Sequence, residues 1–296
     1  MVDVVVVNYN NYKEVISYIE RVKNMMQVSH IVVVDNCSTN NSFEELSKYS
    51  SDKVVILKSE RNGGYGYGNN VGIRYIINNF GFGIIAVTNP DVYYDEESLS
   101  ACERYLEDNS NYIAVAAPRM MNIEGKEEGS AWFIPNWFNY AATRLFWGSR
   151  FFRIRTIQEF KKEAEYCDCV AGSFLVINSR AFFNAGLYDE KIFLYCEETV
   201  MGIKLKNLGY KSVILRDYSF IHAHSTTINS TYNKMKQLKI EWESREYVLK
   251  EYFKISYDKV LCVKALKYIS ILESFVLVKL KEKKDYLIDG KKRLKE

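Results

Sequence analysis

Short apolar runs alternate with helical patterns over about the first 120 residues. The runs at residues 4–7, 31–34 and 54–57 consist of Val, Ile and Leu and are apolar on both faces, which is typical of strands in a buried parallel sheet. Two further strands are predicted at residues 83–87 and 113–117. The helices expected between them lie near residues 15–26, 71–77 and 96–106. This alternation predicts a doubly wound, mostly parallel α/β sheet flanked by helices.

The pattern changes after Pro118. Residues 119–165 are aromatic-rich and irregular, and strand patterns return at residues 173–177 and 211–215. A helix is expected from Glu198, and from residue 233 onward the sequence is helical and rich in Lys. We therefore predict one domain over residues 1–228, with halves at 1–118 and 119–228, and a C-terminal helical extension at 229–296.

Composition is consistent with a globular protein and excludes some classes. The 296 residues carry a net charge of +3, and the near balance gives no support for nucleic-acid binding. Six scattered Cys without a C-x-x-C pair predict reduced thiols in a cytoplasmic protein. The first residues lack a basic leader, and no uncharged apolar run approaches the roughly 20 residues that span a bilayer, so neither a signal peptide nor a membrane span is predicted.

Polar residues follow the predicted strands where each one ends. Asn8, Tyr9 and Asn10 follow the first strand, Asp35 ends the second, and Asn89-Pro90-Asp91 follows the fourth. Because open α/β sheets bind ligands beyond the carboxyl ends of their strands, we expect these residues to converge on one edge.

A glycine-rich segment follows the third strand. Asn62, Gly63 and Gly64 begin it, and Asn69 lies further along, where a helix starts. Glycine allows close backbone approach to a ligand, and a helix N-terminus attracts anions. The segment lacks the last glycine of G-x-G-x-x-G, and a flexible turn would explain it alone. Beside Asp35 and Asp91, a nucleotide diphosphate is the better interpretation.

Three further residue groups are candidates for chemistry. Asp91 could bind Mg²⁺ or Mn²⁺ beside a diphosphate, although a turn or a helix cap is the commoner role of a Pro-Asp pair. The pair formed by Glu197 and Glu198 opens a helix, where acids usually complement the helix dipole. The chain has only 3 His, yet His222 and His224 lie together on one face of an extended segment.

In combination these motifs resemble a family-two glycosyltransferase with the GT-A fold, over residues 2–227. Asn89-Pro90-Asp91 stands where the family has its Asp-x-Asp motif, with Asn89 replacing the first acid, as in rhamnosyltransferase-like members. The resemblance implies that Asp91 binds the metal ion and that His222 is a further ligand, with His224 as the alternative. It also implies nucleotide-binding roles for Asn8, Tyr9, Asn10, Asp35, Asn62, Gly63, Gly64, Asn69 and Asn89.

The second half of the chain carries the remaining part of the resemblance. Residues 193–198 resemble the stretch that ends in the family's catalytic base, so the resemblance implies that Glu198 is the base, with Glu197 beside it. Glu stands here where the family usually has Asp, and Val200 replaces a further family acid. Residues 169–177 resemble the acceptor-side strand. The residues expected to form the acceptor end are Trp132, Asp168, Gly172 and Ser173.

The function that this resemblance implies is a metal-dependent inverting glycosyl transfer. The expected donor is a nucleotide-diphosphate sugar, dTDP-rhamnose or a UDP-hexose, and the acceptor is a lipid-linked oligosaccharide in capsular or cell-wall polysaccharide synthesis. Asn89 and Glu198 leave a non-catalytic sugar-nucleotide-binding or scaffold protein as the alternative. A Rossmann dehydrogenase is disfavoured because its glycine loop would follow the first strand.

The C-terminal extension combines apolar and basic residues. Val260, Val263, Leu266 and Ile269 are helically spaced, and Lys residues dominate after Leu272. A basic amphipathic helix can lie on an anionic bilayer, which predicts peripheral contact with the inner face of the plasma membrane. The alternatives are a helix packed on its own domain with a solvated Lys face, and a homodimer contact.

Overall fold

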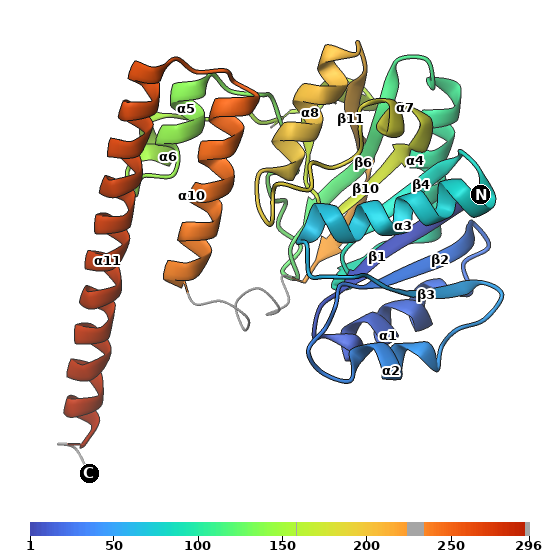
Figure 1. The fold of residues 1–296 in the computed structure, drawn as a ribbon, viewed down its shortest axis with the longest axis horizontal. Helices are drawn as coiled ribbons and strands as arrows, with labels where there is room; N and C mark the ends of the chain where they lie inside the picture. Colours follow the sequence, from blue (N-terminus) through green and yellow to red (C-terminus); the bar gives the residue numbers. More distant parts are fainter. Residues whose placement is uncertain (158, 224–233, 294–296) are drawn as a thin grey trace. The chain divides into compact units, whose positions relative to one another are not determined.

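The computed structural model describes residues 1–157, 159–223 and 234–293 (Figure 1). These residues form two compact units. The first comprises Met1–Ile134 and Arg155–Ile228, and the second comprises Pro135–Ile154 and Asn229–Glu296. The sequence had placed residues 135–154 in the acceptor half, whereas the structure groups them with the C-terminal helices.

The first unit is built on a nine-stranded sheet with the order β3-β2-β1-β4-β10-β6-β11-β5, in which β8 pairs with β11. Its strands are β1 (Val2–Asn8), β2 (Val28–Asp35), β3 (Val54–Lys58), β4 (Ile84–Thr88), β5 (Val92–Tyr93), β6 (Ile113–Met121), β8 (Ala164–Cys167), β10 (Phe174–Asn178) and β11 (Lys211–His222). A separate pair joins β7 (Ala131–Trp132) to β9 (Cys169–Val170). The predicted α/β architecture is confirmed.

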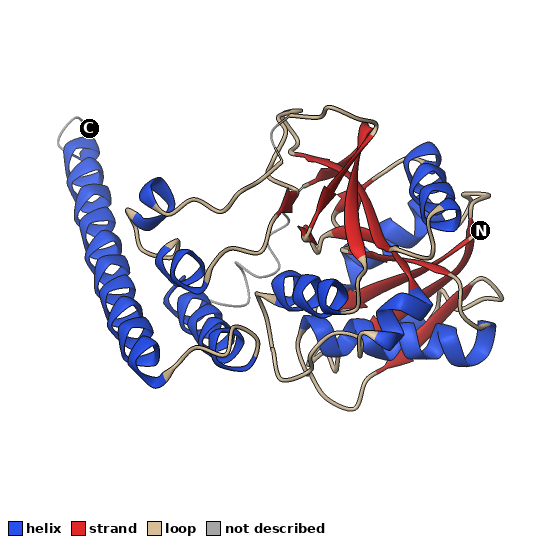
Figure 2. Cartoon of the chain, turned by 90° about the horizontal axis from the view of Figure 1, so that it is seen from above, coloured by secondary structure: helices blue, strands red, loops and turns tan. Residues whose placement is uncertain are grey.

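Helices cover both faces of this sheet (Figure 2). One core holds side chains from α1 (Tyr12–Val22), α2 (Ser42–Ser47) and α4 (Glu96–Asp108). The core on the opposite face holds side chains from α3 (Tyr65–Phe80), α7 (Ser179–Asn184) and α8 (Glu197–Asn207). The Val-rich strands are apolar on both sides because each side faces one of these cores.

The register of the parallel strands brings the predicted polar residues to one edge. β1 pairs in parallel with both β2 and β4, and β2 pairs in parallel with β3. Asn8 lies opposite Asp35, which in turn lies opposite Lys58. The expected convergence of the four strand ends is therefore confirmed. In contrast, the sequence did not predict that β10 runs antiparallel between β4 and β6.

The second unit is helical and has its own packing. It contains α5 (Trp137–Ala142), α6 (Gly148–Phe151), α10 (Lys234–Glu251) and α11 (Tyr257–Arg293). Arg144 Nε lies 2.7 Å from a carboxylate oxygen of Glu241, and the ring of Tyr140 stacks on Phe253 with centroids 5.1 Å apart. Trp242 is fully buried. The predicted C-terminal helices are thus present and pack with residues 135–154.

All six cysteines are free thiols, as predicted. Within the described residues, no helix has both the length and the apolar character that crossing a membrane would require.

Close packing of α3 on β1 gives a testable prediction. A Cβ atom at Gly72 would lie 2.6 Å from Val5 Cγ1 and 3.2 Å from Val34 Cγ2, so Gly72→Val should lower the free energy of unfolding by about 1–3 kcal/mol. Gly83→Val is the control, because a Cβ there meets nothing within 4 Å. Urea denaturation of both variants measures the difference, and equal stability would contradict this packing.

Candidate active site

A buried carboxylate organises the ends of β1 and β2. Asp35 is fully buried, and its Oδ1 accepts hydrogen bonds from Asn8 Nδ2 at 2.7 Å and from the Ser38 hydroxyl at 2.6 Å. The Ser38 N–H donates to Asp35 Oδ2 at 3.1 Å. A buried carboxylate needs such donors, and they hold the loop after β2 against the end of β1.

Asn36 fixes the glycine-rich loop. Its side-chain Nδ2 donates to the Gly64 carbonyl at 2.9 Å and to Asn62 Oδ1 at 3.2 Å, while Asn62 Oδ1 also accepts from the Gly64 N–H. The Ser59 hydroxyl donates to Asn36 Oδ1. The loop is therefore held by side-chain amides.

Close backbone approach accounts for the glycine at position 64. Gly64 has φ of +88°, and a Cβ atom there would lie 1.9 Å from the Phe193 carbonyl oxygen. The Tyr65 N–H donates to this same oxygen at 3.0 Å. Gly64 thus allows the start of α3 to contact the segment that leads into α8.

The turn that carries Asp91 is held from both sides. The Asn89 N–H donates to the Ser173 carbonyl at 2.8 Å. The Arg21 guanidinium donates to the carbonyls of Pro90 at 2.9 Å and Val92 at 3.2 Å. Arg21 lies in α1, about 70 positions from the turn, and sequence analysis did not identify it. These contacts fix the backbone on both sides of Asp91.

Asp91 and His222, the two expected metal ligands, lie side by side. His222 Nε2 is 3.4 Å from Asp91 Oδ2, and the Ala223 N–H donates to the Asp91 carbonyl at 3.0 Å. The antiparallel pairing of β11 with β5 sets this contact, because His222 lies opposite Val92. His224, the alternative ligand, lies outside the described residues.

The donors at this pair are compatible with a divalent cation. One carboxylate and one imidazole suit Mn²⁺, whereas Mg²⁺ prefers oxygen ligands alone. Among the described residues no cluster of three or more His, Cys, Asp or Glu could hold a metal ion. An ion here would therefore need phosphate oxygens or water as its remaining ligands, as is usual at nucleotide sites.

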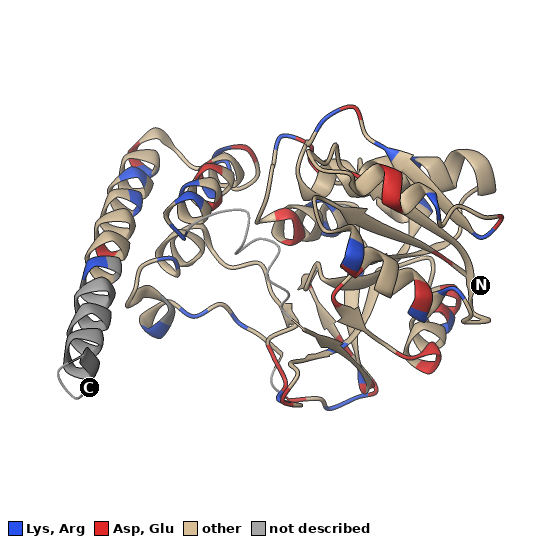
Figure 3. Cartoon of the chain, turned by 90° about the horizontal axis from the view of Figure 1, so that it is seen from below, with Lys and Arg blue, Asp and Glu red and all other residues tan. Residues whose placement is uncertain are grey.

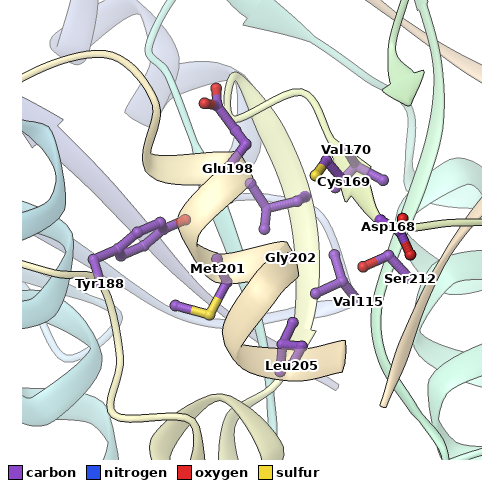
Figure 4. A pocket seen from close by; sticks show the side chains of 11 residues that line it. Val115, Asp168, Cys169, Val170, Tyr188, Glu198, Met201, Gly202, Leu205 and Ser212 are labelled. Carbon is purple, nitrogen blue, oxygen red and sulfur yellow. The ribbon is translucent and has the colours of Figure 1, made fainter. Parts of the chain in front are cut away.

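The candidate base lies at the start of α8, directly after a strained turn. Tyr195 and Cys196 both adopt left-handed backbone conformations, with φ of 71° and 74°. Non-glycine residues in this region cost free energy and cluster at functional sites. Glu198 follows, and its Oε1 accepts a hydrogen bond from the Gly172 N–H at 3.2 Å. Figure 4 shows its carboxylate pointing away from Met201 and Leu205.

The two acids at this helix start are held at raised pKa values. Burial raises the pKa of Glu197, and the negative charge of Glu198 raises it further. Burial also raises the pKa of Glu198, although backbone N–H groups, including that of Gly172, partly oppose this shift. A carboxyl group whose pKa is raised toward neutrality is better suited to accept and release a proton.

The Tyr65 hydroxyl links the separate parts of the site. It donates to the Gly172 carbonyl at 2.5 Å. Burial raises the pKa of Tyr65, and the negative charges of Glu198, Glu197 and Asp91 raise it further. All three carboxylates therefore lie near one phenol, which stays protonated. The sequence contained Tyr65 within the glycine-rich segment but gave no indication of this role.

The residues behind Glu198 enclose only a small cavity. Its volume of about 20 Å³ holds at most one water molecule, so it is no substrate site. Asp168 lines it, and its carboxylate accepts from Lys206 Nζ and from the Ile134 N–H, each at 3.0 Å. The Trp132 carbonyl accepts from the Asp168 N–H at 3.1 Å. These contacts fix the position of Asp168, and its role at an acceptor site stays a prediction.

The expected nucleotide-binding residues differ in exposure. Asn8, Asp35 and Asn69 are at most 1% exposed, and their contact with a nucleotide stays a prediction. Asn8 and Asp35 hold the loop after β2, whereas Asn69 Nδ2 donates to the Tyr65 carbonyl within α3. Gly64 is also buried. The partly exposed members of the set are Tyr9, Asn10, Asn62, Gly63 and Asn89.

The profile of the family described as "Glycosyl transferase family 2" matches residues 3–179. The chain belongs to this family and is a glycosyltransferase. It is 26% identical over 268 residues to a low-salt glycan biosynthesis hexosyltransferase, Agl10, of Haloferax volcanii, covering 87% of this chain and 78% of the relative. It is 28% identical over 150 residues to an N-acetylglucosaminyl-diphospho-decaprenol L-rhamnosyltransferase of Mycobacterium tuberculosis, covering 48% of each.

Solved structures share the fold at low sequence identity. GalNAc-T7 with UDP, GalNAc and Mn²⁺ superposes with a TM-score of 0.61 at 14% identity, covering 86% of this chain and 49% of that one. The mannosyltransferase PcManGT of Pyrobaculum calidifontis, in complex with GDP-Man and Mn²⁺, gives 0.55 at 12% identity, covering 91% and 70%. The chain spans about half the length of GalNAc-T7 and of the rhamnosyltransferase.

The raised pKa of Glu197 predicts a pH-dependent gain in stability on substitution. The pKa of Glu197 in the folded protein lies above the ordinary value of 4.5, so the folded protein retains a proton that the unfolded chain loses. The free energy of unfolding therefore falls as the pH rises from the unfolded-state pKa to the folded-state pKa. Among the described residues, Glu197 Oε1 is buried without a hydrogen-bond partner. Glu197→Gln should therefore raise the free energy of unfolding at pH 8 by roughly 1–3 kcal/mol and leave it little changed at pH 4.

Glu190 provides the matched control, because its pKa is shifted in the opposite direction. Burial favours a higher pKa for Glu190, but hydrogen bonds from Asn70 and Arg74 outweigh it and lower the pKa. Glu190→Gln should thus lower the free energy of unfolding at pH 8, by at most about 1 kcal/mol for a partly exposed pair. Urea denaturation at both pH values measures these changes, and destabilisation of Glu197→Gln at pH 8 would contradict the prediction.

Proposed function

We propose that the chain catalyses metal-dependent, inverting transfer of a sugar from a nucleotide-diphosphate sugar to an acceptor hydroxyl. The observation that carries this proposal is the short path of hydrogen bonds between the candidate metal pair and the candidate base. Asn89, two residues before Asp91, bonds to Ser173, and the adjacent Gly172 bonds to Glu198. A donor diphosphate and a proton acceptor would thus be held at neighbouring positions.

The donor end of the site would hold the diphosphate and the nucleoside. Asp91 and His222 would bind Mn²⁺ or Mg²⁺, and the bound cation would neutralise the charge that develops on the leaving diphosphate. Arg21 keeps the Asp91 turn in place through the Pro90 and Val92 carbonyls. The loops held by Asp35 and Asn36 would form the nucleoside side of the site.

The acceptor end would depend on Glu198. Its carboxylate takes the proton of the acceptor hydroxyl as that oxygen forms a bond to C1 of the donor sugar. The bond between C1 and the diphosphate oxygen breaks, the diphosphate leaves with the electron pair, and the configuration at C1 inverts. The Gly172 N–H orients the carboxylate. A positioned base of this kind contributes about 10²–10⁴-fold in rate.

The substrates are proposed from the relatives' activities together with the Asn89-Pro90-Asp91 motif. A hexosyltransferase and a rhamnosyltransferase are among the relatives, which supports dTDP-rhamnose or a UDP-hexose as the donor. The rhamnosyltransferase acts on a decaprenol-linked diphosphate, which supports a lipid-linked oligosaccharide as the acceptor. We place the reaction in capsular or cell-wall polysaccharide synthesis, on the cytoplasmic side of the membrane.

A panel of nucleotide sugars tests the proposal directly. The protein is incubated with each donor and Mn²⁺, and the released nucleoside diphosphate is measured with and without chelator. We expect metal-dependent release from one donor class. Nucleotide-sugar binding without release, in the presence of lipid-linked acceptors, would instead support the non-catalytic binding protein.

Glu198→Gln tests the assignment of the base. The substitution keeps the shape of the side chain but removes its ability to accept a proton, so kcat should fall by about 10²–10⁴-fold while donor binding is retained. Glu190→Gln is the control, because Glu190 pairs with Arg74 at 2.7 Å and is assigned no role in transfer. Transfer by Glu198→Gln at the wild-type rate would rule out this base.

Asp91→Asn tests the metal site by binding alone. The substitution weakens a carboxylate ligand, so the Mn²⁺-dependent part of nucleoside diphosphate affinity should be lost, by at least about tenfold. Isothermal titration with and without Mn²⁺ measures this part. Asp217→Asn is the control, because Asp217 lies on the same strand as His222 and its side chain is 57% exposed. Equal Mn²⁺ dependence in Asp91→Asn and wild type would refute the assignment.

A further inference from the structure

The two compact units carry opposite net charges. The second unit contains 20 Lys and Arg against 10 Asp and Glu, which gives +10. The rest of the chain therefore contains 20 basic and 27 acidic residues, which gives −7 and accounts for the total of +3. Figure 3 shows basic residues along α10 and the described part of α11. Such asymmetry within one chain is typical of a surface that binds a polyanion or an anionic membrane.

One side of α11 exposes large apolar side chains. Leu261, Tyr268, Leu272 and Phe275 are 53%, 73%, 64% and 52% exposed. Their spacing places them on one side of the helix, whereas Val263 and Ser270, which are 1% exposed, lie on the opposite side. The side of α11 that carries Val263 and Ser270 is therefore already packed. The four exposed apolar side chains form a separate stripe on the other side of the helix.

Two aromatic residues from the α5–α6 connection extend this apolar surface. Phe146 and Trp147 are 52% and 56% exposed. The Phe146 N–H donates to Glu273 Oε2 at 2.9 Å, and the Ser270 hydroxyl donates to the Arg144 carbonyl at 3.1 Å. These contacts hold the connection against α11 at residues 270–273, next to Leu272. We call Phe146, Trp147, Leu272 and Phe275–Leu277 the apolar patch.

The patch is widest near the middle of α11 (Tyr257–Arg293). Phe275, Val276 and Leu277 are consecutive and are 52%, 47% and 40% exposed, so they point in three directions around the α11 axis. In the sequence Lys279, Lys281, Lys283 and Lys284 follow immediately. A broad apolar face, with Trp and Phe beside it and Lys next along the chain, is typical of a helix that lies in the headgroup region of a bilayer.

We propose that the second unit docks on an anionic membrane surface through the apolar patch and the basic residues around it. A second copy of the chain fits less well. Two units that each carry a net charge of +10 would repel each other. A helix–helix dimer would also need apolar residues to continue at a spacing of three and four, but Lys279 and Glu282 occupy the next two such positions after Phe275. Nucleic acid would complement the charge but would leave the patch in water.

Vesicle flotation of the full-length protein tests this surface without donor or acceptor, so the result does not depend on the proposed transfer reaction. We expect the protein to float with vesicles in which about one third of the lipid is phosphatidylglycerol, and not with pure phosphatidylcholine. Binding should weaken at 1 M salt, where the screening length falls to about 3 Å. Equal flotation with neutral vesicles, or none with either kind, would overturn the proposal.

Leu272→Glu should reduce the vesicle-bound to free ratio at least about tenfold, because it removes a large apolar side chain and adds a negative charge. The matched control is Ile123→Glu, since Ile123 is 73% exposed and lies in the first unit. Phe275→Glu provides a second test if Leu272→Glu fails to fold, as judged by thermal unfolding. Wild-type flotation of both patch variants, or a vesicle-free dimer that Leu272→Glu dissociates, would overturn the membrane assignment.

Discussion

The site depends on one backbone contact, between Gly64 and the Phe193 carbonyl. The Tyr65 N–H donates to this carbonyl, and no side chain larger than hydrogen fits at position 64. On one side of the contact, α3 packs on β1 through Gly68 and Gly72. On the other side, the chain turns through Tyr195 and Cys196 into α8. The contact thus joins the sheet edge proposed to bind the nucleotide to the helix that carries the candidate base.

The antiparallel strand β10 gives the second connection. Because β10 runs opposite to β4, its first residues lie beside the last residues of β4. Ser173 therefore meets Asn89, and Gly172 meets both Tyr65 and Glu198. A parallel strand in this place would bring Gly172 to the far end of the sheet. The direction of one central strand explains why residues from both halves of the sequence share an edge.

Local patterns predicted the parts of this arrangement that are local in origin. The Val-rich strands, the polar residues at their ends and the acids that open α8 were all visible in the sequence, because burial on two faces and strand direction determine them. The direction of β10 was not visible, since an apolar run is the same read either way. Arg21 and Asn36 were also missed as positioning residues, because their partners lie about 70 and 26–28 positions away, respectively.

The same geometry places negative charges where the proposed donor diphosphate would bind. The negative charges of Glu198, Glu197 and Asp91 all raise the pKa of the partly buried Tyr65, so three acids act on one side chain. A donor diphosphate would add more negative charge to this region, which like-charge repulsion opposes. Two changes would relieve this repulsion: a divalent cation beside Asp91 and His222, and a proton held on Glu197, which would leave the Glu198 carboxylate able to accept the acceptor's proton. Donor binding would then favour proton uptake by Glu197, and a cation would favour donor binding, so that metal, diphosphate and proton would be thermodynamically linked at this edge.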